Sequence, residues 1–428
     1  MKNIELSMEK IKFLKNFFLI IFFYTVLEGG IRKWFFPNLR VEITLIRDFI
    51  IIYGIFYSFN NGIYNQSQYS KNTIFLWTLL IIFWIIVQLS IKQNYYKVYL
   101  VGFRHWVLYF WFSIMFVNAF SKETVDQISK IILLTIIPIG LLSITQHYLS
   151  SDHVLNTQSG FREEEYIFTV SRGIVRTTAT FSFSSGNGGY MAFITPFFLY
   201  FIDGAYKKNF SKKIKFLLVF CYFFACLTSG SRFVILYCAW MFLGYLAYIL
   251  INRKEKKITT YLFWICVLAI TSLFFFQNSI DATFERFDSD KGSLLARSFE
   301  SMFGSKEVWQ DFSFFGMGIG GGSNLSREYL GGSIFAFGET EPDRILTEGG
   351  FVGLFLIICK FLFSIIVVFK SYKLSKISNN ILPFFFSIYL FQQVMAGVTS
   401  GVTTAHAFTF LGLGFMFLLL TMNRYHEK

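Results

Sequence analysis

Long apolar runs separated by short polar segments dominate this 428-residue chain. A helix that crosses a bilayer needs about 20 predominantly apolar residues, and each run is close to that length. The pattern therefore predicts an all-α polytopic membrane protein with about twelve transmembrane helices. The predicted spans are residues 14–36, 41–58, 73–91, 98–120, 128–149, 188–206, 214–229, 233–251, 258–277, 348–370, 381–398 and 403–422.

The connections between these spans predict the domain organisation. Several are very short, so neighbouring spans should pack antiparallel in one bundle, and we expect residues 1–428 to form a single membrane domain. The connection at residues 278–347 is much longer and is expected outside the cytoplasm. A structureless loop of that length is uncommon in a compact protein, so this large extracytoplasmic loop should be partly helical.

Lysines indicate the orientation of the chain. They cluster at the amino terminus and in the segments 207–215, 254–257 and 370–376, and basic residues mark cytoplasmic loops. Both termini are therefore expected in the cytoplasm. The first apolar run follows a lysine-bearing segment and has no small-residue cleavage site, which predicts a retained signal anchor.

Composition supports the membrane class and narrows the partners. Apolar residues make up 54% of the chain and charged residues only 15%. The net charge of +13 is divided among short loops between spans, as orientation requires, so we expect no nucleic-acid partner. All five cysteines lie inside predicted spans, where they behave as small apolar residues and predict no disulfide.

Arginines have the opposite distribution to the lysines. In this topology only Arg253 and Arg424 lie on the cytoplasmic side. Guanidinium is the preferred partner of phosphate, so the asymmetry predicts a phosphate-bearing ligand that is met from outside. The arginines expected outside or in the outer half of the membrane are Arg32, Arg40, Arg47, Arg104, Arg162, Arg172, Arg176, Arg232, Arg286, Arg297, Arg327 and Arg344.

Some of these arginines have an acid close in sequence. Glu28 and Arg32 have the i,i+4 spacing of a helical ion pair, in a segment, residues 28–37, that also holds two glycines and Trp34. Arg47 adjoins Asp48, which is consistent with a structural ion pair within a span. Arg104 has no such acid and is the stronger candidate for ligand binding.

Three further arginines stand near predicted helix starts. Arg172 and Arg176 precede a hydroxyl-rich stretch that leads into the span at 188–206, and Arg232 follows a tight Ser-Gly-Ser turn. Free backbone N–H groups at a helix start attract anions, which predicts a diphosphate site here. The alternative for the hydroxyl-rich stretch is ordinary helix capping by Ser184, Ser185 or Asn187.

The large loop contributes a glycine-rich run and an acidic cluster. The run 316–322 lacks the strand–turn–helix context of a nucleotide site, so we expect backbone that passes close to a ligand or to another helix. The acidic cluster surrounds Arg344, which has the helical spacing to pair with Glu341 or Glu348. The functional alternative is that one carboxylate acts as general base toward a sugar hydroxyl. The candidates are Glu339, Glu341 and Asp343.

Taken in order, these motifs resemble those of the O-antigen polymerase and O-antigen ligase superfamily of Wzy-like and WaaL-like membrane glycosyltransferases. The resemblance covers most of residues 100–422. It rests on the twelve-span layout and on four motifs in sequence: the stretch 176–189, the Ser231-Arg232 turn, the glycine run 316–320, and the Glu348-x-Gly-x-x-Gly segment that begins the span at 348–370.

The resemblance implies a GT-C-like fold in a bacterial cytoplasmic (inner) membrane and an activity in polysaccharide biosynthesis. The donor would be an undecaprenyl-diphosphate-linked oligosaccharide and the acceptor a sugar hydroxyl. The transfer would invert the anomeric carbon without a metal or other cofactor. Membrane lipid, and a chain-length regulator where one is present, would be the other partners. Within such a reaction, our hypothesis from the residues assigns diphosphate binding to Arg104, Arg172, Arg176 and Arg232, and catalysis to Glu339, Glu341 and Arg344.

One departure from the family pattern favours a polymerase. Family ligases carry His-Asn nine residues before the glutamate that matches Glu348, whereas this chain has Glu339-Thr340 at that place. We therefore expect a polymerase of lipid-linked repeat units. The alternatives are a ligase that transfers finished glycan to a lipid or protein acceptor, and a flippase or transporter of lipid-linked glycan.

Overall fold

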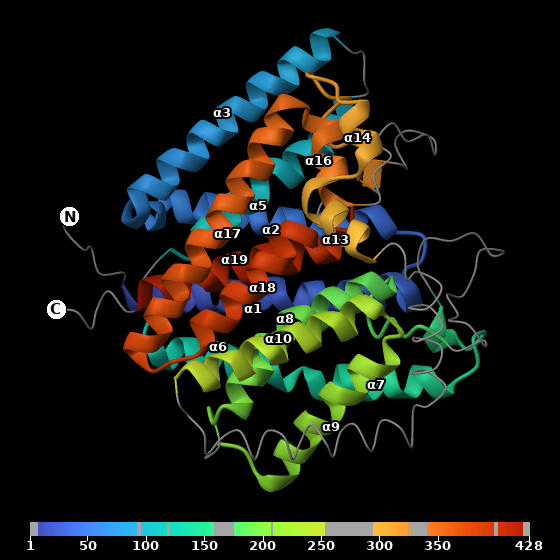
Figure 1. Cartoon of the computed structure of the whole chain (residues 1–428), viewed down its shortest axis with the longest axis vertical. Coiled ribbons are helices and arrows are strands. Elements are labelled where there is room, and N and C mark those ends of the chain that lie inside the picture. The colour runs from blue at the N-terminus through green and yellow to red at the C-terminus, as the bar shows by residue number, and fades with distance from the viewer. Residues whose placement is uncertain are drawn as a thin grey trace. The chain divides into compact units, whose positions relative to one another are not determined.

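The computed structural model describes residues 7–91, 96–117, 120–157, 175–206, 209–252, 294–323, 325–326, 340–397 and 401–422. This part of the chain is built from helices (Figure 1). Their bounds are α1 Met8–Gly30, η1 Ile31–Phe35, α2 Arg40–Asn60, η2 Ile63–Ser67, α3 Gln68–Ile91, α4 Tyr96–Phe103, η3 Arg104–Leu108, α5 Tyr109–Ile114, α6 Lys122–Leu134, α7 Ile136–Tyr148, η4 Val154–Asn156, α8 Ser184–Ile202, α9 Lys212–Thr228, α10 Arg232–Ile251, α13 Leu294–Phe303, α14 Lys306–Gln310, α16 Glu341–Gly349, α17 Phe351–Ser378, α18 Leu382–Ala396 and α19 Thr403–Met422.

The described residues include six helical segments that are long and apolar enough to cross a membrane. The protein is thus a polytopic α-helical membrane protein. A helix occupies each predicted span apart from 258–277, which lies outside the described residues; the count of twelve spans stays a prediction. The six segments are Met8–Phe35, Ser70–Ile91, Lys122–Tyr148, Val234–Ile251, Phe351–Ser378 and Thr403–Thr421.

Proline and left-handed backbone explain where two of these helices break or end. Within Lys122–Tyr148 the chain passes from α6 to α7 at Thr135. Pro138 lacks the N–H that would bond to the carbonyl of Leu134, so the helix cannot continue unbroken there. α17 ends at Asn379, whose φ of 49° is the left-handed conformation that commonly closes a helix and that asparagine tolerates.

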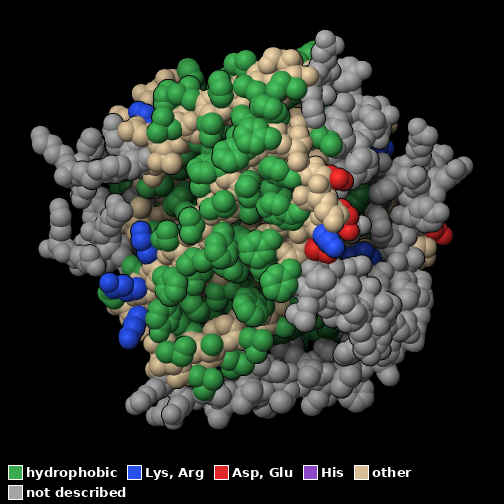
Figure 2. Space-filling view, turned by 45° about the horizontal axis from the view of Figure 1, so that its top comes forward, with side chains coloured by type: hydrophobic (Ala, Val, Ile, Leu, Met, Phe, Trp, Pro, Cys, Tyr) green, Lys and Arg blue, Asp and Glu red, His purple; other side chains and the backbone are tan. Residues whose placement is uncertain are grey.

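Contacts divide the chain into two compact units, and the prediction of one membrane domain stays open. Unit 1 comprises residues 1–25, 44–125 and 293–428. Within it α17 packs along α18, α19 packs along α5 and α18, and α16 lies against α17. Large apolar side chains on α3 and α17, such as Phe83 and Phe369, are exposed, as a helix face in lipid requires. Figure 2 shows one face of the molecule on which hydrophobic side chains predominate.

Unit 2 comprises residues 26–43 and 126–292. Its described helices pack as α7 along α9, α8 along α10, and α8 against α9. α8 is buried along most of its length, and aromatic pairs such as Phe198 and Tyr222, stacked at 3.8 Å, fill the space between α8 and α9. Because nearly the whole helix is buried, apolar residues are distributed around α8 and not along one face.

The described part of the large loop contains helices, as its length predicts. α13, α14 and α16 fall within residues 278–347 or begin there, and α13 and α14 both contact α16. The carboxylate of Asp343 accepts a hydrogen bond from the backbone N–H of Ser305 at 2.6 Å. This bond ties the turn between α13 and α14 to the first turn of α16.

Candidate functional site

A cavity of about 550 Å³ lies within unit 1. Its wall is formed by α3, η3, α5, α16, α17, α18 and α19, and most of the lining side chains are aliphatic or aromatic, such as Leu80, Phe110 and Phe355. A largely apolar cavity in which a few polar groups converge is typical of a ligand site. The lining side chains that carry a charge or an imidazole are His105, Glu341, Lys360 and His406.

Glu341 is held at the cavity wall by the start of α16. Thr340 caps this helix, because its hydroxyl accepts a hydrogen bond from Asp343 N at 3.3 Å, and Pro342 occupies the first turn. An acidic residue is favoured at this end of a helix. The Glu341 side chain is buried, and its Oε1 lies 4.0 Å from Lys360 Nζ on α17. This candidate base, one of the three that the sequence offered, therefore has an ammonium group as neighbour.

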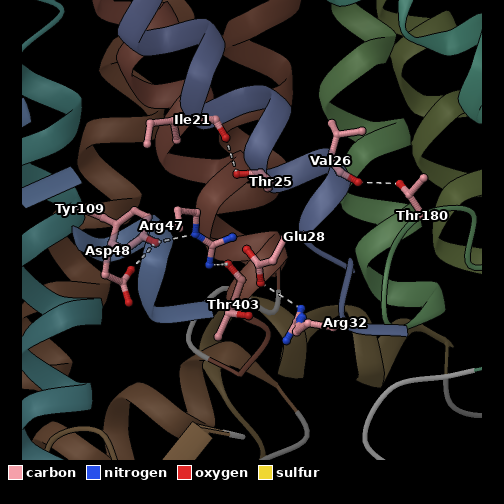
Figure 3. A network of polar contacts seen from close by, with 10 residues as sticks. All are labelled: Ile21, Thr25, Val26, Glu28, Arg32, Arg47, Asp48, Tyr109, Thr180 and Thr403. Atoms are coloured by element: carbon pink, nitrogen blue, oxygen red, sulfur yellow. Dashed lines mark hydrogen bonds and ion pairs between the residues drawn. The ribbon is translucent and has the colours of Figure 1, made fainter. Parts of the chain in front are cut away.

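A buried ionic cluster links α2 to the π-helical turn η3. Asp48 Oδ2 lies 2.5 Å from Arg104 Nε, and Asp48 Oδ1 accepts a hydrogen bond from the Tyr109 hydroxyl at 2.8 Å. The same hydroxyl accepts from Arg47 Nε at 2.9 Å, and Arg47 Nη2 donates to Thr403 O at 3.1 Å (Figure 3). Arg104 thus finds the acid that its local sequence lacks on α2, 56 positions earlier in the chain.

Arg104 still has an unused donor. Its Nη1 lies 3.2 Å from His105 Nε2, and because guanidinium has no acceptor, that imidazole nitrogen accepts and the proton sits on Nδ1. Its Nη2 is buried and makes no hydrogen bond to any described residue. A buried donor without a partner costs about 1–3 kcal/mol, so an arginine in this state needs an explanation.

His406 is in a similar state on the cavity wall. Its ring makes edge contacts with His105 and Tyr109, with centroids 4.8 and 4.5 Å apart. The side chain is only 3% exposed, yet neither ring nitrogen has a hydrogen-bond partner among the described residues. A neutral imidazole offers one donor and one acceptor, so His406 can bind a ligand hydroxyl in either direction.

Glu348 organises the glycine-rich run. Its carboxylate accepts hydrogen bonds from Trp106 Nε1 at 3.0 Å, Gly320 N at 3.0 Å and Gly322 N at 2.8 Å. Gln88 reinforces the same arrangement, because Nε2 donates to Glu348 O at 2.8 Å and Oε1 accepts from Ile319 N at 3.0 Å. Burial raises the pKa of Glu348 to about 7, although these hydrogen bonds oppose the shift. Its partners give this carboxylate a structural role.

The glycines of this run are required by close backbone approach. Gly320 has a φ of +98°, and a Cβ there would lie 2.3 Å from Val98 O and 2.5 Å from Gly102 N. Gly316 would meet Glu348 O at 2.4 Å in the same way. The sequence left open whether the run approaches a ligand or another helix, and in the structure it approaches α4 and the end of α16.

Arg344 projects from α16 toward the same loop. Its Nη1 donates to Gly322 O at 3.1 Å. The guanidinium also lies against Gly401, where any side chain would collide with it, at the turn that precedes α19. Arg344 is therefore positioned between the glycine-rich run and the start of the helix that carries His406.

In unit 2 the hydroxyl-rich stretch is held by the chain itself. Lys33 Nζ donates to Thr178 Oγ1 at 2.9 Å and to Ala179 O at 2.7 Å. Thr180 Oγ1 donates to Val26 O at 2.6 Å (Figure 3), and Thr177 Oγ1 donates to Thr228 O at 3.0 Å. These threonine hydroxyls therefore serve the fold, and the predicted capping does not occur in its simple form, since Phe183 is the N-cap of α8 and makes no side-chain bond.

Residues 28–37 contact the hydroxyl-rich stretch that includes residues 177–182. A Cβ on Gly29 would lie 2.5 Å from Thr180 O and 2.6 Å from Ser182 N, both backbone atoms, so only glycine fits. Glu28 is fully buried and forms the expected ion pair with Arg32, at 2.9 Å (Figure 3). The acid, the glycines and the bases of this motif thus position residues 177–182.

The sequence-predicted site residues fall into three groups. Arg104, Glu341 and Arg344 lie in unit 1, in or beside the elements that form the cavity. Arg176 lies half-buried in unit 2. Glu339, Arg172 and the side chain of Arg232 lie outside the described residues. Sequence reasoning missed two cavity residues, Lys360 and His406. The one available signal was an ionisable residue within an apolar span, which is rare and commonly functional.

Comparison with known proteins adds no further assignment. No protein-family model matches the chain, and neither a curated protein nor a solved structure does.

Proposed function

We propose that the chain polymerises undecaprenyl-diphosphate-linked polysaccharide repeat units. The observation that carries this proposal is the cavity of unit 1: an apolar wall suited to a polyprenyl chain, with a carboxylate, an ammonium and two imidazoles among its lining side chains. Arg104, whose Nη2 makes no hydrogen bond to any described residue, supplies a partner for phosphate in this proposal.

In the proposed reaction a sugar hydroxyl of the acceptor attacks the anomeric carbon of the donor glycan. The new glycosidic C–O bond forms as the bond to undecaprenyl diphosphate breaks, and the hydroxyl proton passes to the Glu341 carboxylate. Lys360 offers the neighbouring positive charge, and His406 holds the hydroxyl through a free ring nitrogen. Burial of these groups strengthens each interaction, because little water competes.

Arginines stabilise the leaving diphosphate in this proposal. Arg104 has the donor that the fold leaves unused, and Arg344 lies on the same helix as Glu341. For Arg172, Arg176 and Arg232, diphosphate binding stays a prediction from the sequence. A well-placed donor to developing charge contributes about 2.7–4 kcal/mol to the rate.

The proposal includes twelve spans with both termini in the cytoplasm of a bacterial inner membrane. In that topology the helix start at Glu341 faces outward, where lipid-linked repeat units would be available. The six candidate spans among the described residues and the lysine distribution support this arrangement.

The experiment is a complementation series in a strain that lacks the protein. Glu341→Gln removes the base without changing its size, and we expect polymer synthesis to fall by about 10²–10⁴-fold while lipid-linked single repeat units accumulate. Arg104→Lys keeps the charge and the contact with Asp48 but loses the second donor arm, with an expected fall of about 10²–10³-fold. Polymer is read on gels and lipid-linked units by mass spectrometry.

Two matched controls accompany these variants. Glu307→Gln lies on exposed α14 of the same loop, and Arg40→Lys lies at the start of α2, where Arg40 Nε donates to Pro37 O; both should leave polymer unchanged. Normal chain length in Glu341→Gln membranes that contain the protein would refute the assigned base. Long polymer that remains on the lipid carrier in the deletion strain would indicate a ligase, and loss of all lipid-linked units from the outer leaflet would indicate a transporter.

A further inference from the structure

Two cysteine thiols meet in the interior of unit 2. Cys226 lies in the last turn of α9 and Cys238 in the second turn of α10, and their Sγ atoms are 3.4 Å apart. Cys226 is 7% and Cys238 8% exposed, so both residues are buried but keep a small accessible surface. Because these cysteines fall inside apolar spans, no disulfide between them was expected from the sequence.

Their surroundings allow the two sulfurs to approach further. A disulfide bond is about 2.05 Å long, so closure needs the two Sγ atoms to approach by about 1.4 Å. Cys238 also lies 3.3 Å from the Tyr222 hydroxyl and 3.9 Å from the Thr195 hydroxyl. Those hydroxyls are 2.8 Å from each other, so they remain paired when Cys238 turns toward Cys226.

We propose that Cys226 and Cys238 form a reversible redox pair that closes to a disulfide across the α9–α10 turn. The oxidant is a dithiol–disulfide exchanger or a small disulfide-forming reagent. A Cys thiolate attacks the oxidant's disulfide sulfur, and the second Cys thiolate then displaces the oxidant from the mixed disulfide. The two cysteines lose two electrons and two protons, and the oxidant leaves as a dithiol.

Formation of the disulfide would restrain the turn between α9 and α10, which contacts Thr177 and leads into Arg232. Thr228 O, two residues after Cys226, accepts hydrogen bonds from Thr177 N at 3.4 Å and from Thr177 Oγ1 at 3.0 Å. The same turn leads into Arg232, where α10 begins. A disulfide would thus fix the carbonyl that holds the segment next to Arg176. This inference does not depend on the proposed function.

The test counts thiols in the full-length protein in detergent. Cys266, outside the described residues, is replaced by serine in every sample, which leaves four cysteines. After treatment with diamide or copper–phenanthroline, denaturation and labelling with a polyethylene-glycol maleimide, we expect two labels in place of four. Dithiothreitol should restore four, and mass spectrometry should find one peptide pair joined through Cys226 and Cys238.

Single variants separate this pair from the other cysteines. Cys226→Ser and Cys238→Ser should each keep all three remaining thiols reactive after oxidation, whereas Cys221→Ser and Cys359→Ser should still lose two. Four reactive thiols after both oxidants, or a link through Cys221 or Cys359, would overturn the proposal. The linked peptide in otherwise unaltered protein answers the question even if a serine variant fails to fold.

Discussion

Two buried clusters of acid and base, one in each unit, use similar residues differently. In unit 1, Asp48 is shared between Arg104 and the Tyr109 hydroxyl, and one arm of Arg104 has no partner among the described residues. In unit 2, Glu28 pairs with Arg32, while the ammonium of Lys33 donates to a threonine hydroxyl and a backbone carbonyl. Figure 3 draws the acid–base pair Glu28–Arg32 and the Asp48–Tyr109–Arg47 chain.

The two clusters differ in what their basic groups contact. In unit 2 the hydrogen bonds of the basic group end on the chain itself, at the stretch that Gly29 also contacts. In unit 1 the cluster adjoins a cavity, and Arg104 Nη2 and both ring nitrogens of His406 are buried without a hydrogen bond to any described residue. A buried polar group without a partner in a native protein calls for an explanation, such as an ordered water, an ion or a catalytic role. Both clusters contain an acid and basic residues, so their charge alone does not distinguish them.

The largest expected effect on stability comes from Asp48→Asn. This change removes the carboxylate that faces Arg104 at 2.5 Å and leaves a buried cation without its acid. Breaking a buried ion pair on one side costs about 3–5 kcal/mol, and the free energy of unfolding should fall by that amount. Denaturant unfolding in detergent micelles measures it.

The control is Glu42→Gln, an exposed carboxylate on the same helix, which should change the free energy of unfolding by less than about 0.5 kcal/mol. A second substitution, Arg104→Met in the Asp48→Asn protein, removes the stranded charge and should recover much of the loss. If Asp48→Asn unfolds like the unaltered protein, the cluster is not the ionic core that the distances indicate.

Glu348 provides the second test, because it is a unit 1 carboxylate whose hydrogen bonds, like those of Lys33, end on the chain. Its pKa is raised by burial from 4.5 to about 7, so the folded protein binds this proton more tightly than the unfolded chain. The stability that the proton contributes is therefore full below pH 4.5 and is lost as pH rises through about 7. Its size is on the order of 3 kcal/mol.

The measurement compares unfolding free energy against pH for the unaltered protein and for Glu348→Gln. Glutamine does not titrate, so the downward slope with rising pH in this window should be absent from the variant, whatever its overall stability. Equal slopes in the two proteins would mean that Glu348 keeps an ordinary pKa. Glu307→Gln, at an exposed carboxylate, should retain the slope.

Most of the fold could be predicted from the sequence, because a bilayer imposes one requirement on every spanning helix. Long apolar runs predicted helices at the places where α1, α3, α17 and α19 lie. The large loop was expected to contain helices, but their positions were not predicted, because α13 and α14 are only 10 and 5 residues long and both are held by contacts with α16. The two-unit grouping had no signal in the chain.

The site was less predictable, because it depends on contacts distant in sequence. Arg104 was a candidate because it has no local acid, yet Asp48 reaches it from α2. The threonines at 177–180 suggested anion binding. In the structure the hydroxyls of Thr177, Thr178 and Thr180 form hydrogen bonds with other residues of the protein. Lys360 and His406 are single ionisable residues in apolar runs, and only the fold brings them to the wall that holds Glu341.

The smallest expected effect, from Lys33→Met, tests the other half of the comparison. Lys33 is 7% exposed and has no carboxylate partner among the described residues, so its removal also removes the cost of burying a charge. Ala179 O keeps a second donor, Gln146 Nε2 at 3.1 Å, and methionine fills a similar volume. We therefore expect the free energy of unfolding to change by less than about 1 kcal/mol, measured as for Asp48→Asn. A loss as large as that of Asp48→Asn would show that Lys33 neutralises an anion in the folded protein, and unit 2 would then hold a ligand site of its own.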